Sequence, residues 1–333
     1  MTNLVRSASL TNFAVIARSA GLDPLALLAD ADLDPVCLHD PDLRIPSDTV
    51  RRLLEAAATA SKMDNFGLRM AETRQLSNLG AVALVVREEP TVRRVVRAWM
   101  RYSHLMNQSL FMKLEEEDGI AVIREQLVGQ RGPSRQGTEL LVGVMFRSLK
   151  FFLGPAWHPL RVCFMHSPPR DPAVHIRLFG YDVAFGQDFN GLVCKSSDMD
   201  APNPTADPVM ARYARQVLDA GAGEGRMSTV DSVRNILLVL LASGQCSIDM
   251  VAQQLGVDRR TIHRRLLREG TTFSEVVNVI RREMAARYIE DGSRPLSQVA
   301  ELLGFSALSA FSRWYKQQFG ELAGRRRRSR LQA

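Results

Sequence analysis

The sequence predicts a mixed α+β domain over residues 1–205 and an all-α domain over residues 228–324, in which one long helix joins two helix-turn-helix motifs. Three observations favour this fold class. One short pattern occurs twice in the C-terminal third, a stretch near the middle alternates apolar and polar residues, and the excess of positive charge falls entirely on the C-terminal part. With 333 residues, the chain is long enough to form two hydrophobic cores.

The charge distribution indicates a partner for one part of the chain only. From Ser228 onwards there are 17 basic and 10 acidic residues, whereas residues 1–227 carry 26 of each, so the whole formal net charge of +7 lies in the C-terminal part. A basic domain attached to a neutral one is typical of proteins that bind a polyanion such as nucleic acid.

Cysteine usage and hydropathy exclude several other classes of protein. The N-terminus lacks the pattern of a signal peptide, and the longest strongly apolar runs, at Leu79 and Ile236, are well short of the ~18 residues of a membrane span. We therefore expect a cytoplasmic protein without a membrane segment. The cysteines form no CxxC pair, which argues against a disulfide scaffold: they are Cys37, Cys163, Cys194 and Cys246.

The first hundred residues predict a series of helices. Residues 9–30 read as two short helices broken at Gly21-Leu22-Asp23-Pro24, and a longer helix follows Pro46. Further helices are expected near Leu79 and after Pro90.

The period of the apolar residues then changes from helix to strand. Residues 110–127, LFMKLEEEDGIAVIREQL, have period-two apolar positions on both sides of Glu117-Asp118-Gly119, which predicts a β-hairpin. A helix over Thr138–Leu153, a strand over Leu160–His166 and short strands within Gly180–Cys194 follow. The N-terminal domain is therefore expected to be α+β with an antiparallel element.

Residues 206–227 are expected to be a helix opening at Asp207-Pro208, followed by a glycine-rich linker. The segment DAGAGEGRMS, from Asp219, has three alternating glycines but no strand before it and no Lys-Ser/Thr after it, which favours a flexible linker over a phosphate-binding loop. Ser228-x-x-Asp231 then resembles a capping box that opens a helix over Val230–Leu241.

The first copy of the repeated pattern, SIDMVAQQLGVDRRTIHRRLLREG, has the features of a helix-turn-helix in order. Ser247 and Asp258 are predicted to cap its two helices, Gly256 supplies a left-handed residue for the turn, and the small Ala252 lets the helices approach closely. Apolar residues recur at helical spacing on the side that is expected to be buried: Ile248, Val251, Leu255, Ile262 and Leu266.

The second copy, PLSQVAELLGFSALSAFSRWYKQQFG, repeats these features. Ser297 and Ser306 are predicted to cap its helices and Gly304 to make the turn. The expected buried residues are Val299, Ala300, Leu303, Phe311 and Tyr315. Ordinary amphipathic helices with solvated arginines would explain either copy alone, but they explain two ordered copies poorly.

One long helix over residues 273–291 is expected between the copies. A helix fits the major groove, so an exposed face with Arg and His can reach base edges and phosphates. If the long helix is rigid, the second helix of each copy would enter successive major grooves on one face of the DNA, about 34 Å apart.

With both copies in place, the C-terminal part resembles the DNA-binding domain of the AraC/XylS family of bacterial transcription regulators. The residues that carry the resemblance are VAQQLGVDRRTIHRRLLREGTTFSEVVNVIRREMAARYI and LSQVAELLGFSALSAFSRWYKQQFG. The N-terminal part, through RIPSDTVRRLLE, LSNLG, RLFGYDVAFG and DFNGLV, resembles the subgroup with an arabinose-binding-like domain that includes the ornithine-utilisation regulator. The resemblance implies seven helices in the DNA-binding domain and an effector-sensing, dimerising N-terminal domain.

The resemblance also implies which residues face DNA. The base-facing positions of the first copy fall on Arg260, His263 and Arg264, beside Arg259 and Arg268 on the same exposed side. Those of the second copy, with one residue near the phosphate backbone, are Leu308, Ser309, Ser312, Arg313 and Lys316. Because arginine can bind guanine through two hydrogen bonds, the first copy is expected to be the stronger reader of sequence.

The chain departs from the family at its end. The family usually closes with Gly-x-x-Pro-x-x-Tyr/Phe-Arg, whereas this chain has GELAGR from Gly320, followed by more arginines. Residues 325–333 are therefore expected to be a solvated, disordered basic tail, with nonspecific phosphate contacts as the alternative.

These observations predict a sequence-specific DNA-binding regulator without catalytic activity, cofactor or metal. The family resemblance implies a transcription activator that is controlled by a small-molecule effector. The expected partners are double-stranded promoter DNA, a small-molecule effector such as an amino acid or fatty acid, RNA polymerase and a second copy of the chain. The sequence does not identify effector-binding residues, and an N-terminal domain that only dimerises or contacts proteins stays open. An enzyme is the rival class, because five Cys and His side chains share one domain, although none has ligand spacing: His158, Cys163, His166, His175 and Cys194.

Overall fold

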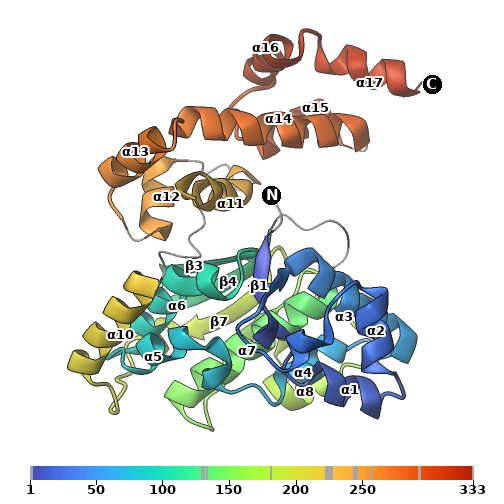
Figure 1. Ribbon diagram of the computed structural model, residues 1–333. Coiled ribbons are helices and arrows are strands. Elements are labelled where there is room, and N and C mark those ends of the chain that lie inside the picture. The colour runs from blue at the N-terminus through green and yellow to red at the C-terminus, as the bar shows by residue number, and fades with distance from the viewer. Residues whose placement is uncertain are drawn as a thin grey trace. The chain divides into compact units, whose positions relative to one another are not determined.

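The computed structural model describes residues 3–128, 132, 134–180, 182–221, 228–242, 247–255, 257–291 and 294–331. The chain divides into two compact units, Met1–Arg226 and Met227–Ala333, and Figure 1 labels the elements of each. No helix of the described part is both long enough and apolar enough to cross a membrane.

The first unit begins with short elements around a two-stranded antiparallel sheet, β1 and β2. The two helices predicted in residues 9–30 are present, and the chain turns between them at Gly21, with φ +75°, before Asp23 caps the second helix. The elements are β1 (Leu4–Arg6), η1 (Ser7–Leu10), α1 (Phe13–Ser19), α2 (Pro24–Asp30), η2 (Pro35–Leu38), β2 (Arg44–Pro46), α3 (Ser47–Ser61), α4 (Phe66–Ala71), η3 (Leu76–Leu79), α5 (Ala81–Arg87) and α6 (Val92–Met106).

The predicted hairpin is confirmed. Strands β3 (Leu110–Glu117) and β4 (Ile120–Leu127) pair antiparallel along their full length, and Asp118 and Gly119 turn the chain with φ +49° and +79°. Positive φ at both turn residues matches the right-handed twist of the two strands. The hairpin is the edge of a five-stranded sheet of order β3-β4-β7-β5-β6, completed by β5 (Arg161–Cys163), β6 (Val183–Ala184) and β7 (Gly191–Lys195).

One face of this sheet packs on helices α6 and α7 (Arg135–Leu153). Inward-facing Ala121 and Ile123 share a core with Trp99 of α6 and Phe146 of α7. Alternation along β4 places the next inward position at Glu125, which is also buried. The inward side of β4 therefore changes from apolar residues of the main core to the carboxylate of Glu125.

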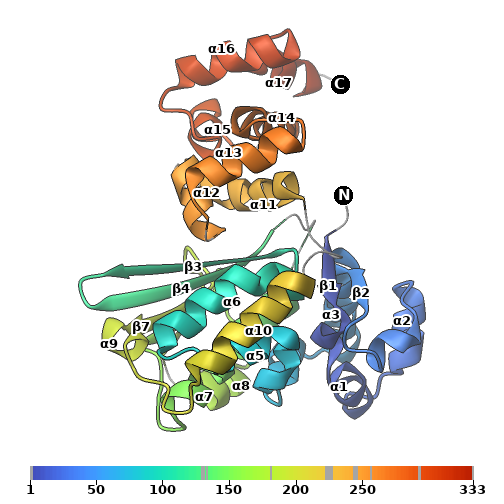
Figure 2. The same cartoon turned by 60° about the vertical axis from the view of Figure 1, so that its left-hand side comes forward.

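Three short helices of this unit were not predicted from the sequence: α4, α8 (Ala173–Phe179) and α9 (Ser196–Met199). The predicted helix after Asp207 is α10 (Pro208–Gly221). Figure 2 shows α5, α6 and α10 side by side. Ala211 and Leu218 of α10 are buried, whereas Tyr213 and Val217 are exposed.

The described part of the second unit contains seven helices: α11 (Thr229–Ala242), α12 (Ile248–Gln254), α13 (Arg259–Arg268), α14 (Phe273–Asp291), α15 (Leu296–Leu302), α16 (Leu308–Phe319) and α17 (Ala323–Leu331). The predicted long helix is α14. Figures 1 and 2 show α14 between the helix pair α12–α13 and the helix pair α15–α16. Ser228 caps α11 by accepting from the N–H of Asp231, and it donates to the Asp231 carboxylate. Most of the predicted glycine-rich linker lies outside the described residues.

The expected disordered tail is wrong as far as Leu331, because α17 continues the fold there. Ala323, near the position where the family has proline, is buried against the core around Phe311 and Tyr315. Arg327 donates to the backbone carbonyl of Arg294 at 2.7 Å. Arginine has a good helix propensity, so the run of arginines from Arg325, for which a tail was predicted, can form a helix.

Candidate nucleic-acid interface and ligand cavities

The first helix pair, α12 and α13, follows the predicted capping chemistry. Ser247 accepts a hydrogen bond from the N–H of Met250 at 3.2 Å, and Asp258 accepts from the N–H of Thr261 at 2.7 Å. The bonds from Thr261 lower the pKa of Asp258, so this cap is charged at neutral pH. The predicted turn residue Gly256 lies outside the described residues.

The buried side of α13 orients its basic side. Ile262 and Leu266 are fully buried, with Val251 of α12. The five residues predicted to face DNA are all exposed: Arg259, Arg260, His263, Arg264 and Arg268. Arg259 lies 4.0 Å from Asp249, a distance that leaves its guanidinium largely solvated. The helix therefore presents a basic surface that a duplex could contact.

The second helix pair, α15 and α16, turns at Gly304 with φ +71°, as predicted. The predicted serine caps are wrong. Helix α15 begins after Pro295, so Ser297 lies in its first turn, and α16 begins after Ala307, one residue beyond Ser306. Neither N-terminus has a side-chain cap, because the start of each helix is set by burial of its apolar side.

Helix α16 carries a weaker set of polar groups than α13. Phe311 and Tyr315 are fully buried. Of the residues predicted to face DNA, Ser312 is half-buried and four are exposed: Leu308, Ser309, Arg313 and Lys316. A surface with one arginine and an apolar residue that is 43% exposed offers fewer hydrogen-bond donors to base edges than α13 does.

Helix α14 fixes the second pair through two polar contacts. Arg281 donates to the carbonyls of Leu303 at 2.9 Å and Gly304 at 3.2 Å, and so satisfies the C-terminal end of α15. The indole N–H of Trp314, on α16, donates to Asn278 at 3.2 Å. Toward the first pair, Glu283 of α14 forms an ion pair with Arg234 of α11. The long helix α14 thus contacts both helices of the second pair.

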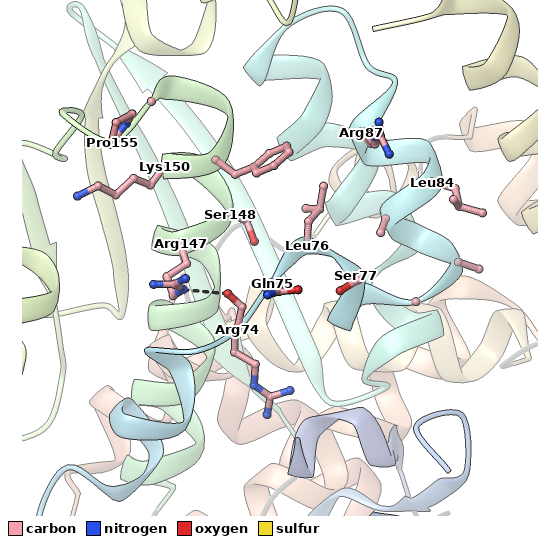
Figure 3. A pocket seen from close by; sticks show the side chains of 15 residues that line it. Arg74, Gln75, Leu76, Ser77, Leu84, Arg87, Arg147, Ser148, Lys150 and Pro155 are labelled. Atoms are coloured by element: carbon pink, nitrogen blue, oxygen red, sulfur yellow. Dashed lines mark hydrogen bonds between the residues drawn. The ribbon is translucent and has the colours of Figure 1, made fainter. Parts of the chain in front are cut away.

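The first unit has a groove between η3–α5 and α7, which Figure 3 shows from close by. Its volume is about 980 Å³. Four cationic side chains and no carboxylate line it in the described part of the chain: Arg74, Arg87, Arg147 and Lys150. Leu76, Leu84 and Phe151 add apolar surface. Arg147 donates to the carbonyl of Arg74 at 2.9 Å.

A smaller cavity of about 90 Å³ in the same unit also has Arg74 in its wall. It is lined from β1–η1, η3, α6, β3, β4 and α7, and seven of its side chains have polar groups. Arg6, Asn78 and Asn107 form hydrogen bonds within the protein. The other four each have a buried atom with no hydrogen-bond partner among the described residues: Glu125 Oε2, Trp99 Nε1, Ser9 Oγ and Arg74 Nε. Burial raises the pKa of Glu125 to about 8 and lowers the pKa of Arg74 to about 10.

Comparison with known protein families shows the family to which the chain belongs. Residues 21–203 match the model of the arabinose-binding domain of AraC transcription regulators, N-terminal, and residues 251–329 match a helix-turn-helix domain model. The first match alone covers more than half of the chain. The protein belongs to the AraC family of transcription regulators. This is a family of DNA-binding regulators and not of enzymes.

Three relatives of this AraC-family protein are transcription regulators, and two of them match it over most of its length. It is 30% identical to the HTH-type transcriptional regulator VirS of Mycobacterium tuberculosis, across 96% of this chain and 94% of VirS. It is 23% identical to the ornithine utilization regulator of Pseudomonas aeruginosa, across 91% and 90% of the two chains. The transcriptional activator NphR of Rhodococcus is 28% identical over 154 residues, which are 43% of this chain and 46% of NphR.

An enzyme with a Cys/His site was the alternative considered from the sequence, but these Cys and His residues do not form one site in this AraC-family protein. His166 and His175 both approach Oε1 of buried Glu139, at 3.4 and 3.1 Å, and Arg135 pairs with the same oxygen at 3.0 Å. No group of three His, Cys, Asp or Glu residues in the described part could hold a metal ion. Burial raises the pKa of the Cys163 thiol and raises that of Cys194 to about 12, which makes both poor nucleophiles.

The cavity of this AraC-family protein was not predicted from the sequence, although one signal for it is present there. In the predicted hairpin strand IAVIREQL, the inward positions are Ala121, Ile123 and Glu125. A carboxylate at the third of these positions breaks the alternation that predicted the hairpin. That Ser9, Arg74 and Trp99 line the same cavity as Glu125 is a tertiary relationship, which periodicity along one strand does not contain.

Proposed function

We propose that this AraC-family regulator is a sequence-specific activator that reads promoter DNA with both helix pairs acting as helix-turn-helix motifs. The observation that carries the proposal is the basic surface of α13, whose five polar residues are exposed while Ile262 and Leu266 anchor the helix. Helix α13 lies at one end of α14, and α16 bonds to α14 through Trp314 and Asn278, so one helix joins the two pairs within the unit. This arrangement supports binding to two successive major grooves.

The two helices have different roles in this proposal. Arg260 and Arg264 lie one helical turn apart, so both can approach guanine edges, with His263 between them. Arg259, Arg268 and Lys316 contact phosphates. On α16, Arg313 and the two serines contribute fewer base contacts, and Leu308 contacts thymine methyl groups. This division makes the half-site of α13 the more stringent one.

Activation, RNA polymerase contact and effector control extend the proposal beyond the family assignment. The name of NphR describes that relative as a transcriptional activator, which supports the same direction here. The match of residues 21–203 to an arabinose-binding domain, with a groove and a cavity inside that unit, supports a small-molecule effector such as an amino acid or fatty acid. An effector acts only if it binds two arrangements of the regulator with different affinity.

The proposal includes a homodimer formed through α10. Its buried residues Ala211 and Leu218 face the core of the unit, and the opposite side is apolar and exposed. Val209, Tyr213 and Val217 recur every fourth residue on that side, and each is more than half exposed. Such a stripe is rare on a monomer, and a second copy of the same helix would cover it.

Selection of duplexes from a random pool by the full-length protein tests the DNA proposal. We expect enrichment of a site with two half-sites about one helical turn apart, the half-site of α13 being the better conserved in the selected pool. Absence of any sequence preference at moderate ionic strength would contradict the proposal. Retained DNA preference with no ligand response in a thermal-shift screen would instead favour the alternative that the first unit only dimerises or contacts proteins.

A further inference from the structure

The cavity beside Glu125 is lined by an acidic and a basic side chain, Glu125 and Arg74, and neither has an ion-pair partner among the described residues. The Glu125 side chain is 3% exposed, and desolvation is the cause of its raised pKa. Arg74 is 5% exposed, and its pKa is lowered by desolvation. Burying a charged side chain without a partner costs free energy. A ligand that places an opposite charge beside a buried carboxylate or guanidinium therefore stabilises its charged form.

The remaining polar atoms of the cavity are hydrogen-bonding groups without partners. Trp99, which is 2% exposed, presents an indole N–H, and Ser9 presents a hydroxyl. The two terminal nitrogens of Arg74 donate to the carbonyls of Ala8 and Ser9, which leaves the Nε–H of Arg74 unused. Native proteins leave few buried polar atoms unpaired, so the four around this cavity are donors and acceptors that a polar ligand can use.

We propose that this cavity binds a small zwitterion, whose ammonium group pairs with Glu125 and whose carboxylate accepts hydrogen bonds from Trp99 and Arg74. The proposal rests on the proposed function, because it identifies the effector class of the regulator. The ligand brings a cation to the carboxylate and an anion to the guanidinium, and it satisfies the indole N–H. The hydroxyl of Ser9 can donate to the carboxylate or accept from the ammonium group.

The size of the cavity sets the size of the zwitterion. A volume of about 90 Å³ is several times the roughly 10–15 Å³ that holds one water molecule, so the cavity admits a small polar ligand. A compound such as glycine or alanine carries both charged groups within a few bonds, whereas a fatty acid offers no cation to Glu125. A polyol could make hydrogen bonds to the same atoms but would bring no anion to Arg74 and no cation to Glu125. The charges therefore favour an amino acid over a sugar fragment.

The ligand also contacts the segment at the start of the chain. Val5, Arg6, Ala8 and Ser9 line the cavity, and Arg74 holds the carbonyls of the last two. Arg6 is fixed by an ion pair with Asp42 at 2.6 Å. A zwitterion bound between Arg74 and Glu125 would join this segment to strand β4 and helix α6.

Calorimetric titration of the full-length protein tests the proposal. The probes are glycine, β-alanine, L-alanine and L-serine, which vary the spacing and size of the zwitterion. N-acetylglycine lacks the ammonium group, glycinamide lacks the carboxylate, and glycerol lacks both. At pH 7 we expect saturable binding of at least one zwitterion, and binding at least ten-fold weaker for its blocked analogues and for glycerol.

Two variants and a matched control assign the binding to this cavity. Burial keeps Glu125 protonated at pH 7 until an ammonium group pairs with it and the proton leaves to solvent. Glu125→Gln keeps the shape of the side chain but cannot ionise, so we expect it to weaken the bound probe at least ten-fold. Trp99→Phe removes the indole N–H and supplies an independent measurement if the first variant fails to fold. Glu117→Gln makes the same chemical change at the exposed end of β3, and we expect no effect.

Several outcomes would overturn the proposal: no zwitterion binds, blocked analogues bind equally well, or neither cavity variant weakens binding. In each case the cavity is not a zwitterion site. The proposed DNA function is measured separately, by titrating a labelled duplex. Zwitterion binding without a DNA preference would contradict that function alone, and DNA binding without zwitterion binding would contradict this proposal alone.

Discussion

Glu269 accepts a hydrogen bond from the backbone N–H of Thr229 at 2.8 Å, although 40 residues separate the two. Its other oxygen accepts from the N–H of Val230 at 2.9 Å. The residue that follows α13 therefore satisfies two of the free N–H groups at the start of α11. Burial alone would raise the pKa of Glu269, but these hydrogen bonds outweigh it and lower the pKa overall. The orientation of the candidate DNA-reading helix thus depends on α11.

Replacing Glu269 by alanine should destabilise the protein by about 1–2 kcal/mol, the usual cost of losing a helix cap. Because the folded-state pKa is lowered, this contribution is present above the unfolded pKa of about 4.3 and disappears as the pH falls through the folded value. Urea unfolding at pH 7 and in steps toward pH 3 measures it. Glu301→Ala, at an exposed position of α15, is the control. An equal effect of the control would refute the cap.

Replacing Arg260 or Arg264 by alanine should lower discrimination at single base pairs by about 1–3 kcal/mol, because each guanidinium can make two bonds to guanine. Arg268→Ala should instead weaken all duplexes alike and reduce the salt slope by about 0.9, as loss of one phosphate contact does. Fluorescence anisotropy with the selected duplex and its single-base variants separates the two effects. Unchanged discrimination in the first two variants would show that neither arginine reads a base.

Replacing Arg281 by methionine should loosen the second helix pair while leaving the first intact. The change removes the donors to Leu303 and Gly304, and an unpaired partly buried carbonyl costs about 1–3 kcal/mol. We expect a footprint that keeps the half-site of α13 and loses that of α16. The neighbouring Arg282→Met is the control, since Arg282 is exposed. Equal loss at both half-sites would mean that Arg281 supports the unit as a whole.

The sequence predicted those features whose cause is local. Asp118-Gly119 turns the hairpin through its own φ preference, and Ser247 and Asp258 cap helices three residues away. The caps assigned to Ser297 and Ser306 failed because a serine before an apolar run is only a local preference. There, burial of Val299 and Phe311 sets the start of each helix.

The features that could not be predicted involve residues distant in the chain. Whether the closing arginines form a tail or a helix depends on the packing of Ala323 and on the bond from Arg327 to Arg294. The Glu125 cavity requires α6, α7 and the first ten residues to meet at the end of β4. Periodicity within one element indicates which side is buried, but not which polar groups of other elements lie opposite.

Replacing Val217 by aspartate should convert the proposed dimer into a monomer. Val217 is 64% exposed, so the change costs little in the isolated unit but buries a charge in a dimer formed through α10. Light scattering coupled to size-exclusion chromatography measures the mass. Gln216→Asp adds the same charge at an exposed position beside the stripe and should leave the mass unchanged. A wild-type monomer at micromolar concentration would contradict the dimer directly.

The pH dependence of stability tests the environment of Glu125 without a ligand. Its folded-state pKa of about 8 is raised above the unfolded value, so stability is full below about pH 4.3 and falls as the unfolded chain ionises first. Arg6 and Arg74 also line the cavity, but Arg6 is paired with Asp42, and burial is the cause of the raised Glu125 pKa.

Between about pH 5 and pH 8, the wild type should lose about 1.4 kcal/mol per pH unit relative to Glu125→Gln. Urea unfolding of both proteins across this range, with Glu117→Gln as the control, measures the difference. Parallel curves for the wild type and Glu125→Gln would show that the carboxylate has access to water or to a cation, and the electrostatic basis for the zwitterion site would be lost.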